Sequence, residues 1–93
     1  MTSAELAAAT TLPAGLTPEA QALWHAKHGN WEAAHNIAQD IHTKMGAWIH
    51  ALLHVIEGDQ WNADYWFAKA GKPSRGSKDI DSLWQEIAQT VLQ

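Results

Sequence analysis

The chain has 93 residues, a formal net charge of −4 with neutral histidines, and no cysteine. This length predicts a single domain with a small core, and the missing cysteine excludes disulfides and thiolate metal sites. Because the net charge is negative and no apolar run approaches the length of a membrane span, we expect a cytoplasmic protein without a nucleic-acid or membrane partner.

Residues 1–16 are rich in Ala, Thr and Leu. Ala4 to Ala9 could form a turn or two of helix, but no signal fixes it, and chain ends fray unless they dock. The opening residues also lack the positive charge and the long apolar run of a signal peptide. We therefore predict that residues 1–16 are a flexible segment and that residues 17–93 form a single helical domain.

The first clear helix signal is Thr17-Pro18-Glu19, which combines an N-cap, a proline at the first helical position and an acid in the first turn. It predicts a helix over 18–28 that ends at Gly29. Asn30 then suits the N-cap of a second helix over 31–42. The apolar face of this second helix contains Ala34, Ile37, Ala38 and Ile41.

The most regular apolar pattern in the sequence belongs to the third predicted helix, which follows a turn near 43–45. One helical stripe of this segment must be buried. It contains Met45, Ile49, Leu52, Leu53 and Ile56. Gly58 suits the left-handed position that ends the helix, and Asp59 suits the N-cap of a fourth helix over 60–70.

Gly71 and Pro73 end the fourth helix, and residues 71–78 form a polar loop. A last helix begins near Asp79 and has a regular 3.6-residue apolar period. This period is set by Ile80, Leu83, Trp84, Ile87, Ala88 and Val91. No segment shows strand alternation, so the sequence predicts an all-α fold of five helices, built as two αα-hairpins plus a C-terminal capping helix.

An internal repeat is the reason for predicting hairpins. Residues 23–30 match residues 52–59 at an offset of 29, and the Trp31-Glu32-Ala33 segment matches Trp61-Asn62-Ala63 after one inserted residue. Each copy is a helix, a Gly-Asn or Gly-Asp turn and a second helix that opens with tryptophan, as in a short helical-repeat array. The two corners resemble those of tetratricopeptide or Sel1-type repeats.

A longer stretch resembles the signature of a family of small bacterial proteins without an assigned activity. It runs from His54 to Gly71, reads HVIEGDQWNADYWFAKAG, and follows Trp48-Ile49-His50. Two positions depart from the family pattern, because members often carry arginine where Val55 stands and tyrosine where Phe67 stands. The resemblance implies an all-helical fold and implies no activity.

Two polar stripes carry the strongest candidate site. The stripe of the second helix contains Trp31, His35, Gln39 and His42. The stripe of the third helix contains His50, His54 and Glu57. If these helices run antiparallel, three histidines and a glutamate could converge as ligands of a divalent metal such as zinc. The alternative is a polar seam in which the imidazoles hydrogen-bond to neighbouring side chains.

Two other groups are candidates. Near the Gly58 corner, an amide and an indole one helical turn apart could hold a small polar ligand, with helix capping and hairpin packing as the alternatives. This group contains Asp59, Asn62, Tyr65 and Trp66. Four cations could bind an anion or simply be solvated at a helix end. They are Lys69, Lys72, Arg75 and Lys78. Core positions are predicted for Trp31, Trp48, Trp61 and Trp84.

The leading interpretation is a non-enzymatic module, without a cofactor, that binds a small polar molecule or a protein segment. Its predicted pocket is lined by His35, Gln39, His50, His54, Glu57, Asn62, Tyr65 and Trp66. One alternative is a metal-dependent enzyme with His35, His50, His54 and Glu57 at the metal and Glu57 as base. Another is a structural subunit that forms a homodimer through its tryptophans. The sequence leaves open whether any reaction is catalysed.

Overall fold

The computed structural model describes all 93 residues and contains α-helices, one short 3-10 helix and no strand. The α-helices are α1 Ser3–Ala8, α2 Pro18–Lys27, α3 Trp31–Ala38, α4 Lys44–Glu57, α5 Gln60–Ala70 and α6 Ile80–Val91. The 3-10 helix, η1 Ser77–Asp79, directly precedes α6. The prediction of an all-α fold is confirmed. The predicted count of five helices is one too low, because α1 also forms.

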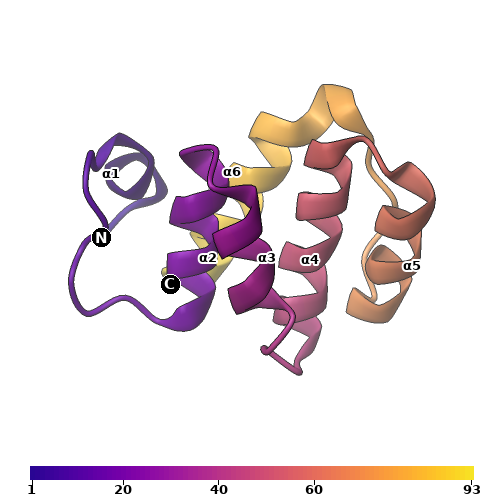
Figure 1. Ribbon diagram of the computed structural model, residues 1–93, viewed down its shortest axis with the longest axis horizontal. Coiled ribbons are helices and arrows are strands. Elements are labelled where there is room, and N and C mark those ends of the chain that lie inside the picture. Colours follow the sequence, from indigo (N-terminus) through magenta and orange to yellow (C-terminus); the bar gives the residue numbers. More distant parts are fainter.

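Helix α4 is the centre of the molecule. Figure 1 shows α4 between α3 and α5, with α6 passing behind, and α4 packs against all three as well as against α2. Ten of its 14 residues are buried. Its predicted apolar stripe is fully buried in the middle, at Ile49, Leu52 and Leu53, and half-buried at the ends. The stripe therefore faces the core as its spacing predicts.

The helix corners follow the predicted local chemistry with one exception. Gly58 ends α4 in the left-handed conformation, at φ +85°, and the carboxylate of Asp59 accepts a hydrogen bond from the Asn62 amide at 3.2 Å. Asn30 precedes α3, but its side chain makes no capping bond. Its amide nitrogen instead lies 3.4 Å from Nδ1 of His25 on the preceding helix, which explains why the predicted cap is wrong.

Helix α3 is shorter than predicted, because it ends at Ala38 and not near His42. The chain must reverse before α4 begins at Lys44, and Thr43 caps that helix by accepting a hydrogen bond from the Gly46 amide at 3.1 Å. A strong N-cap at Thr43 requires extended backbone there, so the helical stripe cannot continue to it. His42 consequently lies in the connection between the two helices.

Helix α1 has a complete capping box that fixes its start. The amide of Thr2 donates to the Glu5 carboxylate at 2.8 Å, and the Glu5 amide donates to the Thr2 hydroxyl at 3.1 Å. Leu6 is fully buried, and the indole nitrogen of Trp24 donates to the Ala9 carbonyl at 3.0 Å. Segment 1–16 thus contains a helix that is docked on α2 through these contacts.

The tryptophans divide between core and surface. Trp48 and Trp84 are buried as predicted, and Trp31 is half-buried. Trp61 is 85% exposed, so its predicted core position is wrong. The reason is that α5 buries the opposite face, at Ala63, Phe67 and Ala70. None of the helices is both long and apolar enough to cross a membrane.

Candidate metal centre

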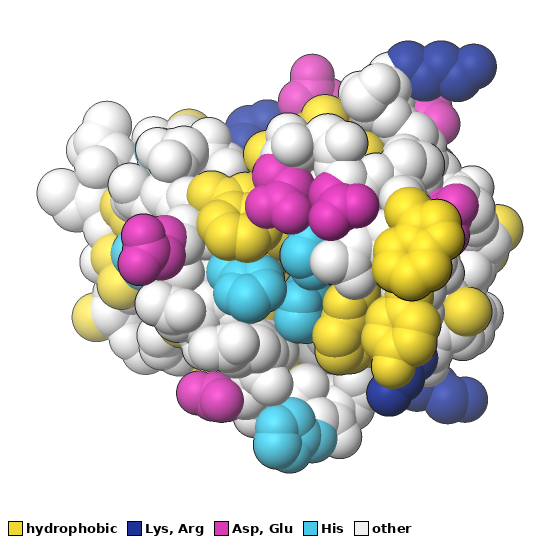
Figure 2. All heavy atoms as spheres, turned by 45° about the vertical axis from the view of Figure 1, so that its right-hand side comes forward, with side chains coloured by type: hydrophobic (Ala, Val, Ile, Leu, Met, Phe, Trp, Pro, Cys, Tyr) yellow, Lys and Arg dark blue, Asp and Glu magenta, His cyan; other side chains and the backbone are white.

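Three histidine rings meet where α3 faces α4. His35 comes from α3, whereas His50 and His54 come from successive turns of α4. One nitrogen of each ring lies within 4.8 Å of a nitrogen of the other two. His50 and His54 are each 6% exposed, and His35 is half-buried. Figure 2 shows histidine side chains gathered near the middle of one face, with hydrophobic side chains on either side and acidic ones beside them.

Trp31 sets the position of His35. Its indole nitrogen donates a hydrogen bond of 2.7 Å to the Leu53 carbonyl of α4, and its ring stacks on the His35 ring at 4.8 Å and 14°. Trp31 and His35 are one turn apart on the same face of α3. The bond to α4 therefore turns that face toward His50 and His54. The four-residue spacing of Trp31 and His35 is the sequence signal for this role.

Trp66 of α5 forms the opposite wall of the cluster. Its ring lies parallel to the His50 ring at 3.9 Å and 10°, and the His50 ring stacks in turn on His54 at 4.9 Å. Stacking on both faces restricts the rotation of His50. The centre thus takes residues from three consecutive helices, α3, α4 and α5.

Glu57 lies behind His54. Its carboxylate is 3.0 Å from Nδ1 of His54, three residues earlier on the same helix. A carboxylate that holds Nδ1–H fixes the tautomer of the ring and leaves Nε2 free as a ligand. The Glu57 carboxylate lies within 4.8 Å of ligand atoms of His54 and Asp59, whereas His54 forms a separate set of this kind with His35 and His50. Glu57 therefore supports a histidine of the cluster instead of converging with all three.

The environment lowers the pKa of two of the three histidines, His50 and His35. Burial, followed by the proximity of His35 and His54, lowers the pKa of His50 to about 4. Burial and the neighbouring His54 also lower the pKa of His35, and Glu57 opposes this shift. At neutral pH these two rings therefore carry free lone pairs.

The nitrogens of His35 and His50 are also available to a ligand. Among the histidine side chains, only those of His25 and His54 are hydrogen-bonded within the chain. No fully buried side-chain nitrogen or oxygen lacks a partner. The unbonded nitrogens of His35 and His50 therefore reach the surface, so that an ion can approach them.

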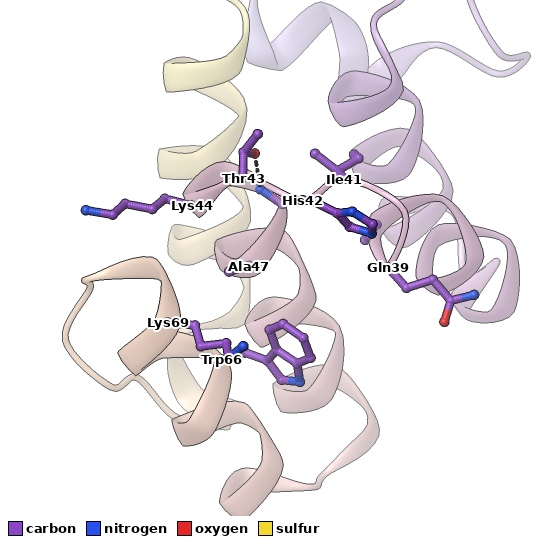
Figure 3. Close-up of a pocket in the computed structure, with 10 residues that line it drawn as sticks. Gln39, Ile41, His42, Thr43, Lys44, Ala47, Trp66 and Lys69 are labelled. Atoms are coloured by element: carbon purple, nitrogen blue, oxygen red, sulfur yellow. Dashed lines mark hydrogen bonds between the residues drawn. The ribbon is translucent and has the colours of Figure 1, made fainter.

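The remaining predicted site residues lie outside the cluster. Gln39 is exposed at the end of α3 and lines a separate hollow together with His42 (Figure 3). The amide nitrogen of Asn62 donates to the Asp59 carboxylate at 3.3 Å and so serves the helix corner. Tyr65 is 51% exposed and meets the edge of Trp66.

Two of the four predicted cations near the end of α5 are engaged by other side chains. Arg75 pairs with Glu86 and lies 3.9 Å from the Asp79 carboxylate. Lys72 lies over the Trp48 ring, at 4.3 Å from its centroid. Arg75 and Lys72 therefore contact different helices, α6 and α4, and are engaged separately.

Comparison of the chain with protein-family models, curated proteins and solved structures gives no match. The resemblance to the small bacterial family and to tetratricopeptide-type corners therefore stays a prediction. The geometry of the histidine cluster carries the functional inference.

Proposed function

We propose that the protein is a non-enzymatic binding module that holds one divalent transition-metal ion on His35, His50 and His54. The observation that supports this is the approach of three imidazole nitrogens to within 4.8 Å of one another. Tetrahedral zinc with Zn–N bonds of about 2.1 Å places its ligand nitrogens about 3.4 Å apart. Metal binding would therefore require side-chain movements that bring the three nitrogens closer together. This geometry favours a metal over the organic ligand that the sequence alone favours.

The donor set selects the kind of metal. All three donors are imidazoles, which bind zinc, copper, nickel and cobalt, whereas magnesium and calcium require oxygen ligands. The Glu57 carboxylate on Nδ1 of His54 is the outer partner that metal-binding histidines usually have. Three protein ligands leave a fourth position for water or another ligand.

Two features favour binding over catalysis. Glu57, the base that the enzyme alternative requires, is hydrogen-bonded to His54. The residue after His50 is Ala51, so the glutamate of the His-Glu-x-x-His motif of zinc peptidases is missing. Glu57 is therefore placed to orient His54, and the chain lacks a glutamate at the position that activates water in zinc peptidases.

The test is calorimetry with zinc chloride on protein stripped with a chelator. We expect one zinc to bind per chain. His50→Gln and His54→Gln should each lower the zinc affinity by at least about a hundredfold, because each variant removes a ligand. The matched control is His28→Gln, an exposed histidine outside the cluster, which should bind zinc normally. Circular dichroism checks that each variant stays helical. No zinc binding by the unmodified protein, or equal binding by His54→Gln, would reject the proposal.

A further inference from the structure

A second concave site lies beside the histidine cluster, with Trp66 at its edge. It is a hollow of about 350 Å³ bounded by the α3–α4 connection, the first turn of α4 and α5. Figure 3 shows Trp66 and Lys69 of α5 on one side of it and Gln39 and His42 on the other. Its volume is at the lower end of the range for small-molecule sites. The hollow therefore has room for a ligand of metabolite size.

The lining of the hollow is positively charged. Its charged residues are Lys44 and Lys69, and it contains no carboxylate, although the whole chain has a net charge of −4 with neutral histidines. His42 adds an imidazole that can donate a hydrogen bond. Neither lysine takes part in an ion pair, since the ion pairs of the molecule involve other cations. Their charges are therefore not neutralised by the protein. Such a concave surface attracts anions.

The first turn of α4 adds to this field. Thr43 accepts the Gly46 amide, but the amides of the first helical residues have no partner within the helix and carry the positive end of its dipole. The lysines and the helix dipole thus have the same sign and act on the same hollow.

The aromatic wall indicates what else the ligand contains. Trp66 lines the hollow and is held by its stacking on His50 at 3.9 Å. The ammonium group of Lys69 lies 5.6 Å from the centroid of the Trp66 ring. A flat indole next to a cation that has no ion-pair partner suits a molecule with a planar part and an anionic group.

We infer that this hollow binds a small organic anion, whose carboxylate or phosphate meets Lys69 and His42 and whose planar part packs on Trp66. Lys44, whose side chain points away from Gln39 and His42 in Figure 3, contributes charge at the rim. Gln39 offers an amide for a neutral polar group of the same ligand.

The test uses benzoate and phenyl phosphate as probes in an NMR titration of metal-free protein. We expect either probe to shift the signals of Lys69, His42 and Trp66. Benzamide lacks the anionic group and inorganic phosphate lacks the planar ring, so we expect each to bind about tenfold more weakly than the two probes. Absence of binding by both aromatic anions at millimolar concentration would overturn the inference.

Variants separate this site from the metal centre. Lys69→Gln should lower the affinity for the probe about tenfold, because it removes a charge-assisted contact. Lys78→Gln, which changes an exposed lysine outside the hollow, should leave the affinity for the probe unchanged. Lys69→Gln should bind zinc as the unmodified protein does, because Lys69 is not one of the three histidine ligands. Equal affinity in the Lys69 and Lys78 variants would overturn the inference, whatever the result with zinc.

Discussion

His50 is enclosed by Trp66 on one side and by His54 and His35 on the others. This enclosure removes water from the imidazole and places two like groups next to it, so the charged form is disfavoured. The same enclosure that makes His50 a neutral ligand therefore makes it sensitive to acid.

The stability of the protein should fall in mild acid because of His50. Its pKa is about 4 in the folded chain and about 6.5 in an unfolded one. Between these values the unfolded state binds more protons, so the free energy of unfolding decreases as the pH falls from about 6.5 to about 4, by about 2–3 kcal/mol. Urea melts at neutral pH and near pH 4 measure the loss. His50→Gln should show a smaller loss, and an equal loss would contradict the assignment.

Glu57 should matter for the metal without being a ligand. Because it holds Nδ1–H of His54, Glu57→Gln should keep the stoichiometry of zinc and weaken its affinity about 10–100-fold. Calorimetry provides both values. Glu32→Gln, an exposed acid on α3, is the control for the loss of one negative charge. Loss of the full stoichiometry in the Glu57 variant would make Glu57 a direct ligand.

At the scale of elements, Gly58 and Gly46 require glycine for different physical reasons. Gly58 has a left-handed backbone, but a side chain there would meet nothing within 4 Å. Gly46 is helical, and a Cβ there would lie 2.0 Å from the Ile41 carbonyl oxygen. The first position is limited by backbone conformation and the second by space, which predicts different costs.

Gly58→Ala should lower the free energy of unfolding by about 1 kcal/mol, the typical cost of left-handed backbone at a residue with a Cβ. Gly76→Ala is the control, because Gly76 has negative φ and a Cβ there would lie at an ordinary contact distance of 3.7 Å from the Gln60 side chain. Urea melts of the two variants give the comparison. A neutral result for Gly58→Ala would show that the α4–α5 corner tolerates a side chain.

Gly46→Ala should cost more, about 3 kcal/mol or above, because the clash is with backbone that a rotamer change cannot relieve. The connection of residues 39–43 would have to move, and with it the wall of the hollow that contains His42. We expect a lower melting temperature together with weaker binding of phenyl phosphate. A variant as stable as Gly58→Ala would contradict the close packing of the two chain segments.

Local signals predict the elements well where neighbours in sequence decide them. The caps at Thr17 and Asp59 and the turn at Gly58 are such cases. The end of α3 depends on where α4 must begin. The apolar period of residues 31–42 contains no information on that point. The prediction for residues 1–16 missed a local signal, the Thr2-x-x-Glu5 capping box that fixes the start of α1. The burial of Leu6 is decided by packing and could not be predicted from this signal.

The candidate site likewise combines features that the sequence predicts with features that only packing decides. Helical spacing predicts that His50 and His54 share a face and that His35 can lie opposite. The stacking of Trp66 on His50 depends on how α5 rotates against α4, and this rotation also leaves Trp61 exposed. Periodicity within a single helix contains no information on that rotation.

At the scale of the whole molecule, α6 fixes the C-terminal part of the chain against the core. The indole nitrogen of Trp84 donates a bond of 2.7 Å to the Leu23 carbonyl of α2, 61 residues away. Leu83, Ile87 and Ala88 are fully buried beside it. Helix α6 therefore covers apolar surface of both α2 and α4.

Trp84→Phe should lower the free energy of unfolding by about 1–3 kcal/mol, because it removes a buried hydrogen bond and part of a packed ring. Trp61→Phe makes the same chemical change at an exposed position and should cost less than about 0.5 kcal/mol. Thermal melts followed by circular dichroism compare the two. Similar costs would show that α6 is not fixed through Trp84.

Trp61 and Tyr65 lie one turn apart on the exposed face of α5. The homodimer expected from the tryptophan content stays a prediction. Sedimentation of the unmodified protein and of Trp61→Phe over a range of concentrations measures whether this face associates.

The burial of α4 on every side also determines how fast its amide protons exchange with solvent. A helix whose residues Gly46 to Val55 are all buried can exchange these amides only when the whole chain opens. Helices α3 and α5 each have a solvent-facing side and can open on their own. We therefore expect His50 and His54 to lie on the slowest-exchanging segment, and His35 and Trp66 to lie on segments whose amides exchange faster.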